Sequence, residues 1–382
     1  MPFLDTWFKK MIEAGASDLH LTTGSKPLIR ESGDMKPLDG NDTLTEDKMK
    51  VYLAEIAPKL NWEEFSKDGD TDFAYDLPGL ARFRANFFMD QTGPGAVFRV
   101  IPSKIQTVKD LNLPQSVIDL CFLSKGLVLV TGPTGSGKST TLAAMVNHIN
   151  ENRHDHVITI EDPIEFVHPN KNCLINQREV RRHTQSFKRA LRAALREDPD
   201  IVLIGEMRDL ETVEIALETA ETGHLVFGTL HTTTAASTVD RVVDQFPTSQ
   251  QAQIRTMLAS SLKGVVAQTL LKRLPRGRIA ALEVLIANSA IANYIREAKT
   301  YQIPTAMQVG ANQGMRLLND TLLDLVKRKF VDPNEAYIKA VDKQDLKTKF
   351  DQIGVKVTLA EVANYAATAP KAASTMSGTA KI

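Results

Sequence analysis

A glycine-rich segment that ends in a lysine and two hydroxyl residues is the part of this 382-residue chain that points most directly to chemistry. It follows the pattern G-x-x-x-x-G-K-[ST], after an apolar run that ends at Val130 and before a helical pattern that begins at Thr140. Glycines in such a loop let backbone N–H groups surround phosphate oxygens, and the helix adds the positive end of its dipole. The residues that we expect to bind ATP are Gly132, Pro133, Thr134, Gly135, Ser136, Gly137, Lys138, Ser139 and Thr140.

Three glutamates stand where two other apolar runs end. We expect Lys138 to contact the β- and γ-phosphates and Ser139 to bind Mg²⁺. Hydrolysis also needs carboxylates, and ligands of open α/β sheets bind at the carboxyl ends of the strands. We therefore expect Glu206 to hold the Mg²⁺ shell with Ser139, and either Glu161 or Glu165 to orient the attacking water. The alternative is that one or two of these acids only cap helices.

Two histidines, His224 and His231, flank one apolar run and so lie at the two ends of one predicted buried strand. About seven residues of extended chain would hold them more than ~20 Å apart, too far to share a metal ion. We therefore expect no zinc site and assign both histidines as sensors, with His231 hydrogen-bonding near the γ-phosphate or a neighbouring subunit. The alternative is a structural histidine bonded to the backbone.

Arginines gather in two places. Arg82, Arg84 and Arg99 lie on predicted strands near the N-terminus. Their functional interpretation is that of arginine fingers, which neutralise γ-phosphate charge across a subunit interface, and the alternative is a salt-bridged surface. A second set follows one face of a predicted helix and is interpreted as a solvated surface: Arg189, Arg192 and Arg196.

The hydrophobic pattern predicts several parts that position these residues. Short apolar runs separated by helical patterns indicate central parallel strands with crossover helices, at Leu127–Val130, Val157–Ile160, Ile201–Ile204 and Leu225–Phe227. We expect a small α+β domain over residues 1–101, an interdomain linker over 102–114, an α/β ATPase core over 115–287, a helical subdomain over 288–365 and a disordered tail over 366–382.

Composition excludes some classes of protein. Lys plus Arg equals Asp plus Glu at 46 each, which argues against a nucleic-acid-binding surface. The two cysteines, Cys121 and Cys173, lie far apart and suggest neither a disulfide framework nor a cysteine-rich metal site. No signal peptide and no run of about 20 apolar residues is present, so we expect a cytoplasmic protein that reaches a membrane only through a partner.

Taken together, these motifs resemble the type IV pilus retraction ATPases of the PilT/PilU type, within the secretion and traffic ATPase group. The similarity covers roughly residues 1–345. The segments that carry it, besides the phosphate loop, are Ala16–Leu21, Arg82–Asn86, Val97–Ser103, Glu161–Glu165, Gly205–Asp209 and Gly223–Thr232.

The resemblance implies a PAS-like N-terminal domain, a RecA-like P-loop ATPase domain with a helical C-terminal subdomain, and a homohexamer with ATP between subunits. Its cofactors would be ATP and Mg²⁺, and its partners an inner-membrane pilus platform protein and a paralogous retraction ATPase. It would power pilus disassembly and twitching motility from the cytoplasmic side of the inner membrane. The resemblance also makes Arg82, Arg84 and Arg99 interdomain phosphate contacts.

Two features bear on the choice within this group. Extension and secretion motors carry a further N-terminal domain and a cysteine-rich motif after the histidine segment, and the absence of both here favours retraction. Near the C-terminus, family members have a segment similar to Ala-Ile-Arg-Asn-Leu-Ile-Arg-Glu. In the corresponding segment of this chain, Ala290–Glu297, Ala292 replaces the first arginine and Tyr294 replaces the leucine. The alternative function is therefore an accessory or regulatory ATPase paralogue of the pilus machinery. Another secretion ATPase or a RecA-like nucleic-acid motor are the remaining alternatives.

Overall fold

The computed structural model describes residues 2–31, 34–38, 40, 42–101 and 104–358. These residues form two compact units. The first unit comprises the chain up to Ile105 together with Pro163–Val167, and the second comprises Gln106–Asp162 and the chain from His168 onward. The predicted disordered tail, 366–382, lies outside the described residues.

The first unit is built on an antiparallel six-stranded sheet with the order β3-β2-β1-β6-β5-β4. Side chains alternate along β5, where Phe83, Ala85 and Phe87 are buried. Phe8 stacks on Phe83 with ring centroids 4.3 Å apart, so helix α1 closes this side of the sheet. The elements are α1 Leu4–Glu13, β1 Asp18–Thr22, β2 Leu28–Glu31, β3 Asp34–Pro37, α2 Glu46–Ile56, α3 Lys59–Asp68, β4 Asp70–Leu77, β5 Ala81–Asp90 and β6 Gly93–Ile101.

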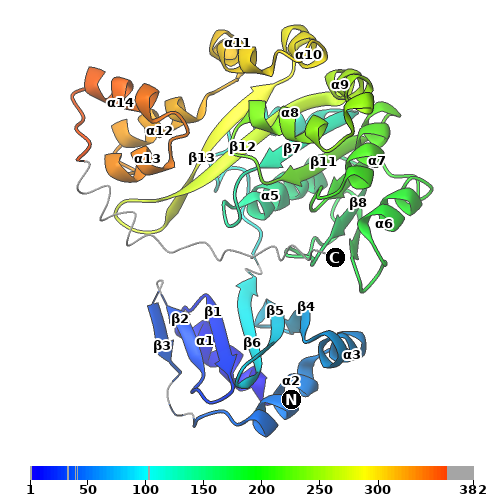
Figure 1. The fold of residues 1–382 in the computed structure, drawn as a ribbon, viewed down its shortest axis with the longest axis vertical. Helices are drawn as coiled ribbons and strands as arrows, with labels where there is room; N and C mark the ends of the chain where they lie inside the picture. The colour runs from blue at the N-terminus through cyan, green and yellow to red at the C-terminus, as the bar shows by residue number, and fades with distance from the viewer. Residues whose placement is uncertain (1, 32–33, 39, 41, 102–103, 359–382) are drawn as a thin grey trace. The chain divides into compact units, whose positions relative to one another are not determined.

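The second unit is built on a seven-stranded sheet with the order β13-β12-β7-β11-β10-β8-β9. The six strands from β12 to β9 run parallel, and β13 at the edge is antiparallel to β12 (Figure 1). The strands are β7 Gly126–Thr131, β8 His156–Glu161, β9 Leu174–Glu179, β10 Ile201–Ile204, β11 Leu225–Leu230, β12 Leu262–Lys272 and β13 Arg278–Ile286.

Both faces of this sheet are covered, which explains why its strands are continuous apolar runs rather than alternating ones. On β7, Leu127 and Leu129 join one hydrophobic core with helices α6 to α11, whereas Val128 and Val130 join a second core with α4 and α5. The helices are α4 Gln115–Asp119, α5 Lys138–Asn152, α6 Phe187–Ala194, α7 Leu210–Glu221, α8 Ala235–Asp244, α9 Thr248–Ser261, α10 Ser289–Arg296 and α11 Ile303–Val309.

The hairpin of β12 and β13 is the main element that the sequence analysis did not predict. Gly264 and Gln268 interrupt its apolar residues, and the pairing of β12 with β7 shifts register between Leu262 and Gly264. Beside the hairpin lie three short helices, which share a separate hydrophobic core with Leu271 of β12 and Ala281 of β13 (Figure 1). These are α12 Leu318–Lys327, α13 Pro333–Lys339 and α14 Lys343–Gln352.

Part of the segment predicted as an interdomain linker packs into the second unit. Val108 and Leu113 are buried there against Val117 and Leu120. Residues 102 and 103 lie outside the described part of the chain.

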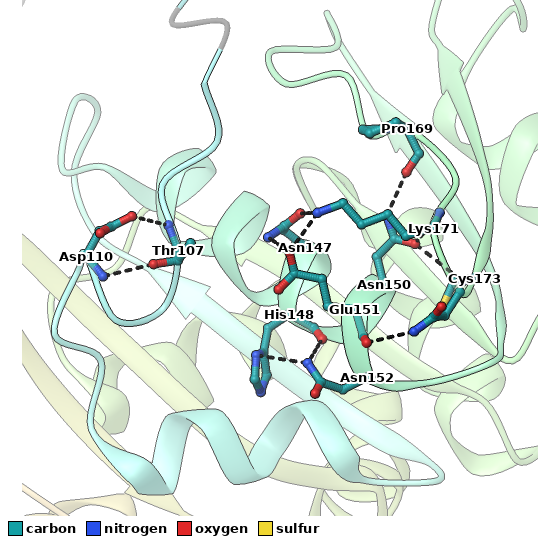
Figure 2. A network of polar contacts seen from close by, with 11 residues as sticks. Thr107, Asp110, Asn147, His148, Asn150, Glu151, Asn152, Pro169, Lys171 and Cys173 are labelled. Atoms are coloured by element: carbon teal, nitrogen blue, oxygen red, sulfur yellow. Dashed lines mark hydrogen bonds and ion pairs between the residues drawn. The ribbon is translucent and has the colours of Figure 1, made fainter.

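A polar network ties the second half of α5 to the segment that leads into β9 (Figure 2). The Lys171 ammonium donates to Asn147 at 2.8 Å and to Glu151 at 2.7 Å. The Asn150 amide donates to the carbonyl of Pro169 at 2.7 Å. The hydrogen bonds hold the start of the edge strand against the helix that follows the phosphate loop.

A buried glutamate on β13 joins two helix N-termini. Glu283 is 6% exposed and accepts the backbone N–H of Ala235 at 2.7 Å and of Leu318 at 3.1 Å. Those are the first residues of α8 and α12, so one carboxylate satisfies an unpaired donor of each helix. Burial raises the pKa of Glu283, although the two backbone hydrogen bonds act in the opposite direction. Among the described residues, no helix is both long enough and apolar enough to cross a membrane.

Glu283→Ala should lower the free energy of unfolding by about 2 kcal/mol or more, because two buried N–H groups lose their acceptor. Because the folded pKa is raised, the stability that comes from protonated Glu283 is present below about pH 4.3 and is lost as pH rises through the folded pKa. The measurement is urea denaturation followed by circular dichroism at several pH values. The exposed Glu218→Ala is the control, and an equal pH dependence in wild type and Glu283→Ala would contradict the assignment.

Candidate functional site

The predicted phosphate loop lies between β7 and α5, as its motif requires. Helix α5 begins at Lys138, two residues before the predicted start of the helical pattern, and Gly137 precedes it with φ +89°. Gly132 and Gly135 also have positive φ, at +146° and +76°. A Cβ on Gly132 would lie 2.2 Å from the carbonyl oxygen of Gln268, so no larger residue fits there. The backbone of the loop can therefore follow phosphate oxygens closely.

A residue that the sequence analysis missed holds this loop. Gln268 on β12 is 3% exposed, and its amide nitrogen donates to the carbonyl of Ser136 at 2.6 Å. Its amide oxygen accepts from the Thr141 hydroxyl at 2.8 Å. One side chain thus joins the loop to the first turn of α5. Nothing in the sequence pattern identifies Gln268. It lies 132 residues after Ser136 and is not part of the phosphate-loop motif.

Lys138, His231 and Glu206 form a continuous polar chain at the carboxyl end of the sheet. The Lys138 ammonium donates to the carbonyls of Gly132 and Pro133 at 2.8 and 3.2 Å and lies 3.4 Å from Nδ1 of His231. The Nε2 of His231 is 2.8 Å from Oε1 of Glu206. Because an ammonium only donates, Nδ1 accepts and Nε2–H donates to Glu206.

The carboxylate of Glu206 is held in its charged form. Burial alone would raise the pKa of Glu206, but the hydrogen bond and charge of Arg208, with those of His231, hold it below the usual range. The Nε of Arg208 lies 2.5 Å from Oε1 of Glu206. Arg208 is a second residue that the sequence analysis did not assign, although it stands two positions after the predicted acid.

Glu161 lies at the neighbouring strand end. Residues of β8 and β10 pair as far as Ile160 and Ile204, so Glu161 and Gly205 follow side by side. A Cβ on Gly205 would lie 3.2 Å from the Cα of Glu161. The Thr159 hydroxyl donates to Oε1 of Glu161 at 2.6 Å, which orients that carboxylate at the strand end.

The structure does not gather all the predicted site residues. Glu165 belongs to Pro163–Val167, which is part of the first unit, so its place beside the phosphate loop stays a prediction. His224 lies at the opposite end of β11 from His231, where its Nδ1 is 3.1 Å from the carbonyl of Thr219. A full buried strand separates His224 from Lys138, so the structure does not bring it to the phosphate loop, and its assignment as a sensor stays a prediction.

The three predicted phosphate-contact arginines lie in the first unit. Nε of Arg99 bonds to Asp18 at 2.7 Å, and the Asp18 side chain is 4% exposed whereas that of Arg99 is 67% exposed. The remaining two arginines pair with acids at the surface, Arg82 with Asp76 at 3.3 Å and Arg84 with Asp72 at 3.7 Å. Asp18 is thus a buried anchor that leaves the end of the Arg99 guanidinium exposed.

The residues present fit a magnesium nucleotide. The glycine conformations let the loop backbone curve around a phosphate, and Lys138 supplies a positive charge. The Ser139 hydroxyl and the Glu206 carboxylate are the kind of oxygen ligand that Mg²⁺ prefers. The strand ends of β8, β10 and β11 bring the acids and His231 to the edge where the loop begins. The arrangement can bind a nucleotide and hold charged groups beside its terminal phosphate.

Comparison with known proteins agrees with this chemistry. Residues 1–362 match the family model described as type II/IV secretion system protein. The chain is 51% identical over 326 residues to the type IV pilus retraction ATPase PilT of Pseudomonas aeruginosa, covering 85% of this chain and 94% of that protein. It is 35% identical to the type IV pilus ATPase PilU of the same organism, covering 88% of each.

A solved structure supports the fold. The crystal structure of the pilus retraction motor PilT with bound ADP aligns with a TM-score of 0.84 and 46% identity, covering 91% of this chain and 99% of that one. The predicted fold class is therefore confirmed: a PAS-like α+β domain precedes a RecA-like P-loop ATPase domain with C-terminal helices. The chain belongs to the type II/IV secretion system protein family, and within it to the type IV pilus retraction ATPases of the PilT/PilU type.

Proposed function

We propose that the chain is a hexameric motor that converts ATP hydrolysis into the retraction of type IV pili and so drives twitching motility. The chain of contacts from Lys138 through His231 to Glu206 is the observation that carries this proposal. It connects the group that grips the γ-phosphate to the acid that faces it. Loss of that phosphate therefore changes the contacts of His231, which follows β11, and of Glu206, which follows β10, at the same time. A motor requires such coupling, whereas a protein that only binds nucleotide does not.

The residues have separate roles in hydrolysis. Lys138 neutralises charge on the terminal phosphates, and the backbone of Gly132–Thr140 binds their oxygens. Ser139 and Glu206 hold Mg²⁺, which when bound neutralises charge on the β- and γ-phosphates. Glu161 or Glu165 orients the attacking water and accepts its proton. His231 reports the state of the phosphate to Glu206.

The first unit completes the site in a ring. Arg82, Arg84 and Arg99 are the interdomain phosphate contacts of this proposal, because guanidinium groups stabilise charge that spreads over the transferring phosphoryl oxygens. The bond between Asp18 and Arg99 supports it, since a fixed Nε leaves the other guanidinium nitrogens free to reach a phosphate. Six such interfaces give a homohexamer.

The partner and the location follow from the same proposal. A retraction motor works on the cytoplasmic face of the inner membrane, where an inner-membrane platform protein passes its motion to the fibre. A paralogous retraction ATPase is a second expected partner. In this proposal, docking on the platform protein supplies the attachment to the membrane.

An accessory ATPase paralogue is the second candidate function, and Ala292 motivates it. Ala292 and Tyr294 lie on α10, half-buried against the main core of the second unit. An arginine at position 292 would add a charge at the border of that core. The higher identity to the PilT relative than to the PilU relative, 51% against 35%, favours the motor.

Gln268→Ala should weaken ATP binding by about 10-fold or more, because the Ser136 carbonyl and Thr141 hydroxyl lose buried partners and the loop loses its shape. The measurement is titration of a fluorescent ATP analogue in the presence of Mg²⁺. Gln250→Ala, an exposed glutamine of α9, is the control. Unchanged affinity in Gln268→Ala would show that the loop does not depend on this clamp.

Replacing each acid by its amide separates the catalytic roles. Glu206→Gln should lower single-turnover hydrolysis by about 10²-fold or more, since the amide carries no charge for the metal. Of Glu161→Gln and Glu165→Gln, the variant at the water-orienting position should lose a similar factor while ATP affinity stays within about threefold. Full activity in Glu206→Gln would remove that residue from the mechanism.

Retraction is tested in the host cell. Deletion of the gene should increase pilus number and length and abolish twitching. The Lys138→Ala variant should restore neither normal pili nor twitching, because its loop no longer binds the γ-phosphate. The measurement is pilus imaging with a twitching-zone assay, with the wild-type gene as control. Unchanged pili and twitching after deletion, with normal ATPase activity of the purified protein, would contradict the motor. With this chain as the sole retraction ATPase, an increase in retraction in Ala292→Arg would favour the accessory function.

A further inference from the structure

A second glutamine holds the segment that carries the two candidate water-orienting acids. Gln177 lies half-buried on edge strand β9, where it pairs with Thr159 of β8. Its amide oxygen accepts the backbone N–H of His168 at 2.8 Å, and its amide nitrogen lies 3.2 Å from Oε1 of Glu161. One side chain therefore joins the two ends of the segment that runs from Glu161 to His168.

The chemistry of the two partners fixes the orientation of this amide. A backbone N–H can only donate, so the amide oxygen of Gln177 must face His168. The amide N–H groups then face Glu161, whose ionised carboxylate only accepts hydrogen bonds. The Thr159 hydroxyl donates to the same carboxylate oxygen at 2.6 Å. One donor from β8 and one from β9 thus hold Oε1 of Glu161.

The far end of the segment is anchored as well. His168 is 9% exposed, and burial together with the charge of Lys171 lowers the pKa of its ring to about 4, so the ring is neutral at physiological pH. The amide of Asn150 on α5 donates to the carbonyl of Pro169 at 2.7 Å and accepts the backbone N–H of Lys171 at 3.1 Å (Figure 2). His168 therefore offers Gln177 a fixed point within the second unit.

Glu165 lies in sequence between these two ends. Asp162 and His168 belong to the second unit, and Pro163–Val167 between them belongs to the first. A short stretch of chain that is held at both ends has far fewer conformations than one that is held at a single end. Gln177 therefore restricts Glu161 through a direct hydrogen bond and Glu165 through the backbone.

We propose that Gln177 is a positioning residue for ATP hydrolysis, which holds the water-orienting carboxylate in place at the strand end. This role rests on the proposed function of Glu161 or Glu165 in orienting the attacking water. Hydrolysis needs the reacting groups in near-attack geometry, and a displacement of about 1 Å can cost about 10²-fold in rate. Loss of the two Gln177 hydrogen bonds should therefore slow the chemical step and leave ATP binding by the phosphate loop unchanged.

The test separates ATP affinity from single-turnover hydrolysis in two variants of the full chain. Gln177→Met keeps the size of the side chain but removes both hydrogen bonds. Gln177→Glu keeps the acceptor for His168 but removes the donor to Glu161 and places a second negative charge beside it. Each should lower the single-turnover rate by about 10-fold or more, while affinity for a fluorescent ATP analogue with Mg²⁺ stays within about threefold.

Matched controls and a double variant show whether Gln177 acts through the acid. Gln250→Met and Gln250→Glu, at an exposed position of α9, should hydrolyse ATP as wild type does. In the background of whichever acid-to-amide variant loses hydrolysis, Gln177→Met should lower the rate by no more than about threefold further, because no carboxylate is left to position. Thermal melting checks folding, and Gln177→Glu supplies the result if Gln177→Met is unstable.

Two kinds of result would overturn the proposal, and they differ in what they leave standing. Loss of hydrolysis in Glu161→Gln or Glu165→Gln, with wild-type rates in both Gln177 variants or a fully independent loss in the double variant, removes the role of Gln177 alone. Wild-type hydrolysis in both acid variants removes the proposed function of the segment and the positioning role with it. A loss of ATP affinity that accounts for the whole effect of Gln177→Glu also contradicts positioning of the acid.

Discussion

The shape of the phosphate loop depends on one buried amide. The side chain of Gln268 bonds to the Ser136 carbonyl and the Thr141 hydroxyl. The backbone carbonyl of Gln268 leaves space only for a glycine at position 132. The loop is therefore held from the side by β12 as well as from its ends by β7 and α5. A loop of glycines without such support would lose much entropy on ordering around a nucleotide. The clamp provides that order in advance.

The order of strands explains how one edge collects the rest of the chemistry. Strand β7 lies between β12 and β11, and β10 and β8 follow on the β11 side. Gln268 therefore reaches the loop from one neighbour and His231 reaches Lys138 from the other. Glu206 and Glu161 come from the next two strands, so the polar chain runs across the sheet in the order of its strands. The contacts from Lys138 through His231 to Glu206 thus connect the loop to β10 across the sheet and not along the sequence.

The sequence predicts the parts of this arrangement that depend on local pattern. Short runs such as Ile201–Ile204 are buried on both faces of a sheet, and so they are visible as continuous apolar residues. Gln268 and Asp18 were not assigned roles because their partners are distant in sequence, and a polar residue within a strand has no pattern that names its partner. His224 and His231 have the same type and similar neighbours. Only the direction of β11 distinguishes them, because it places His231, and not His224, at the strand end beside Lys138.

The total charge of the sequence likewise does not show where charged residues gather on the folded surface. The balanced totals of acidic and basic residues predict no strong field over the whole surface, yet they do not constrain local clusters. The arginines of α6 look like a solvated helix face when only their spacing is considered. In the structure Arg189, Arg192 and Arg196 are exposed, whereas Ala190, Leu191 and Ala194 on the other face of the helix are buried in the core. The spacing of these residues thus predicts which face of the helix is exposed, but the total charge does not show where on the surface the basic residues gather.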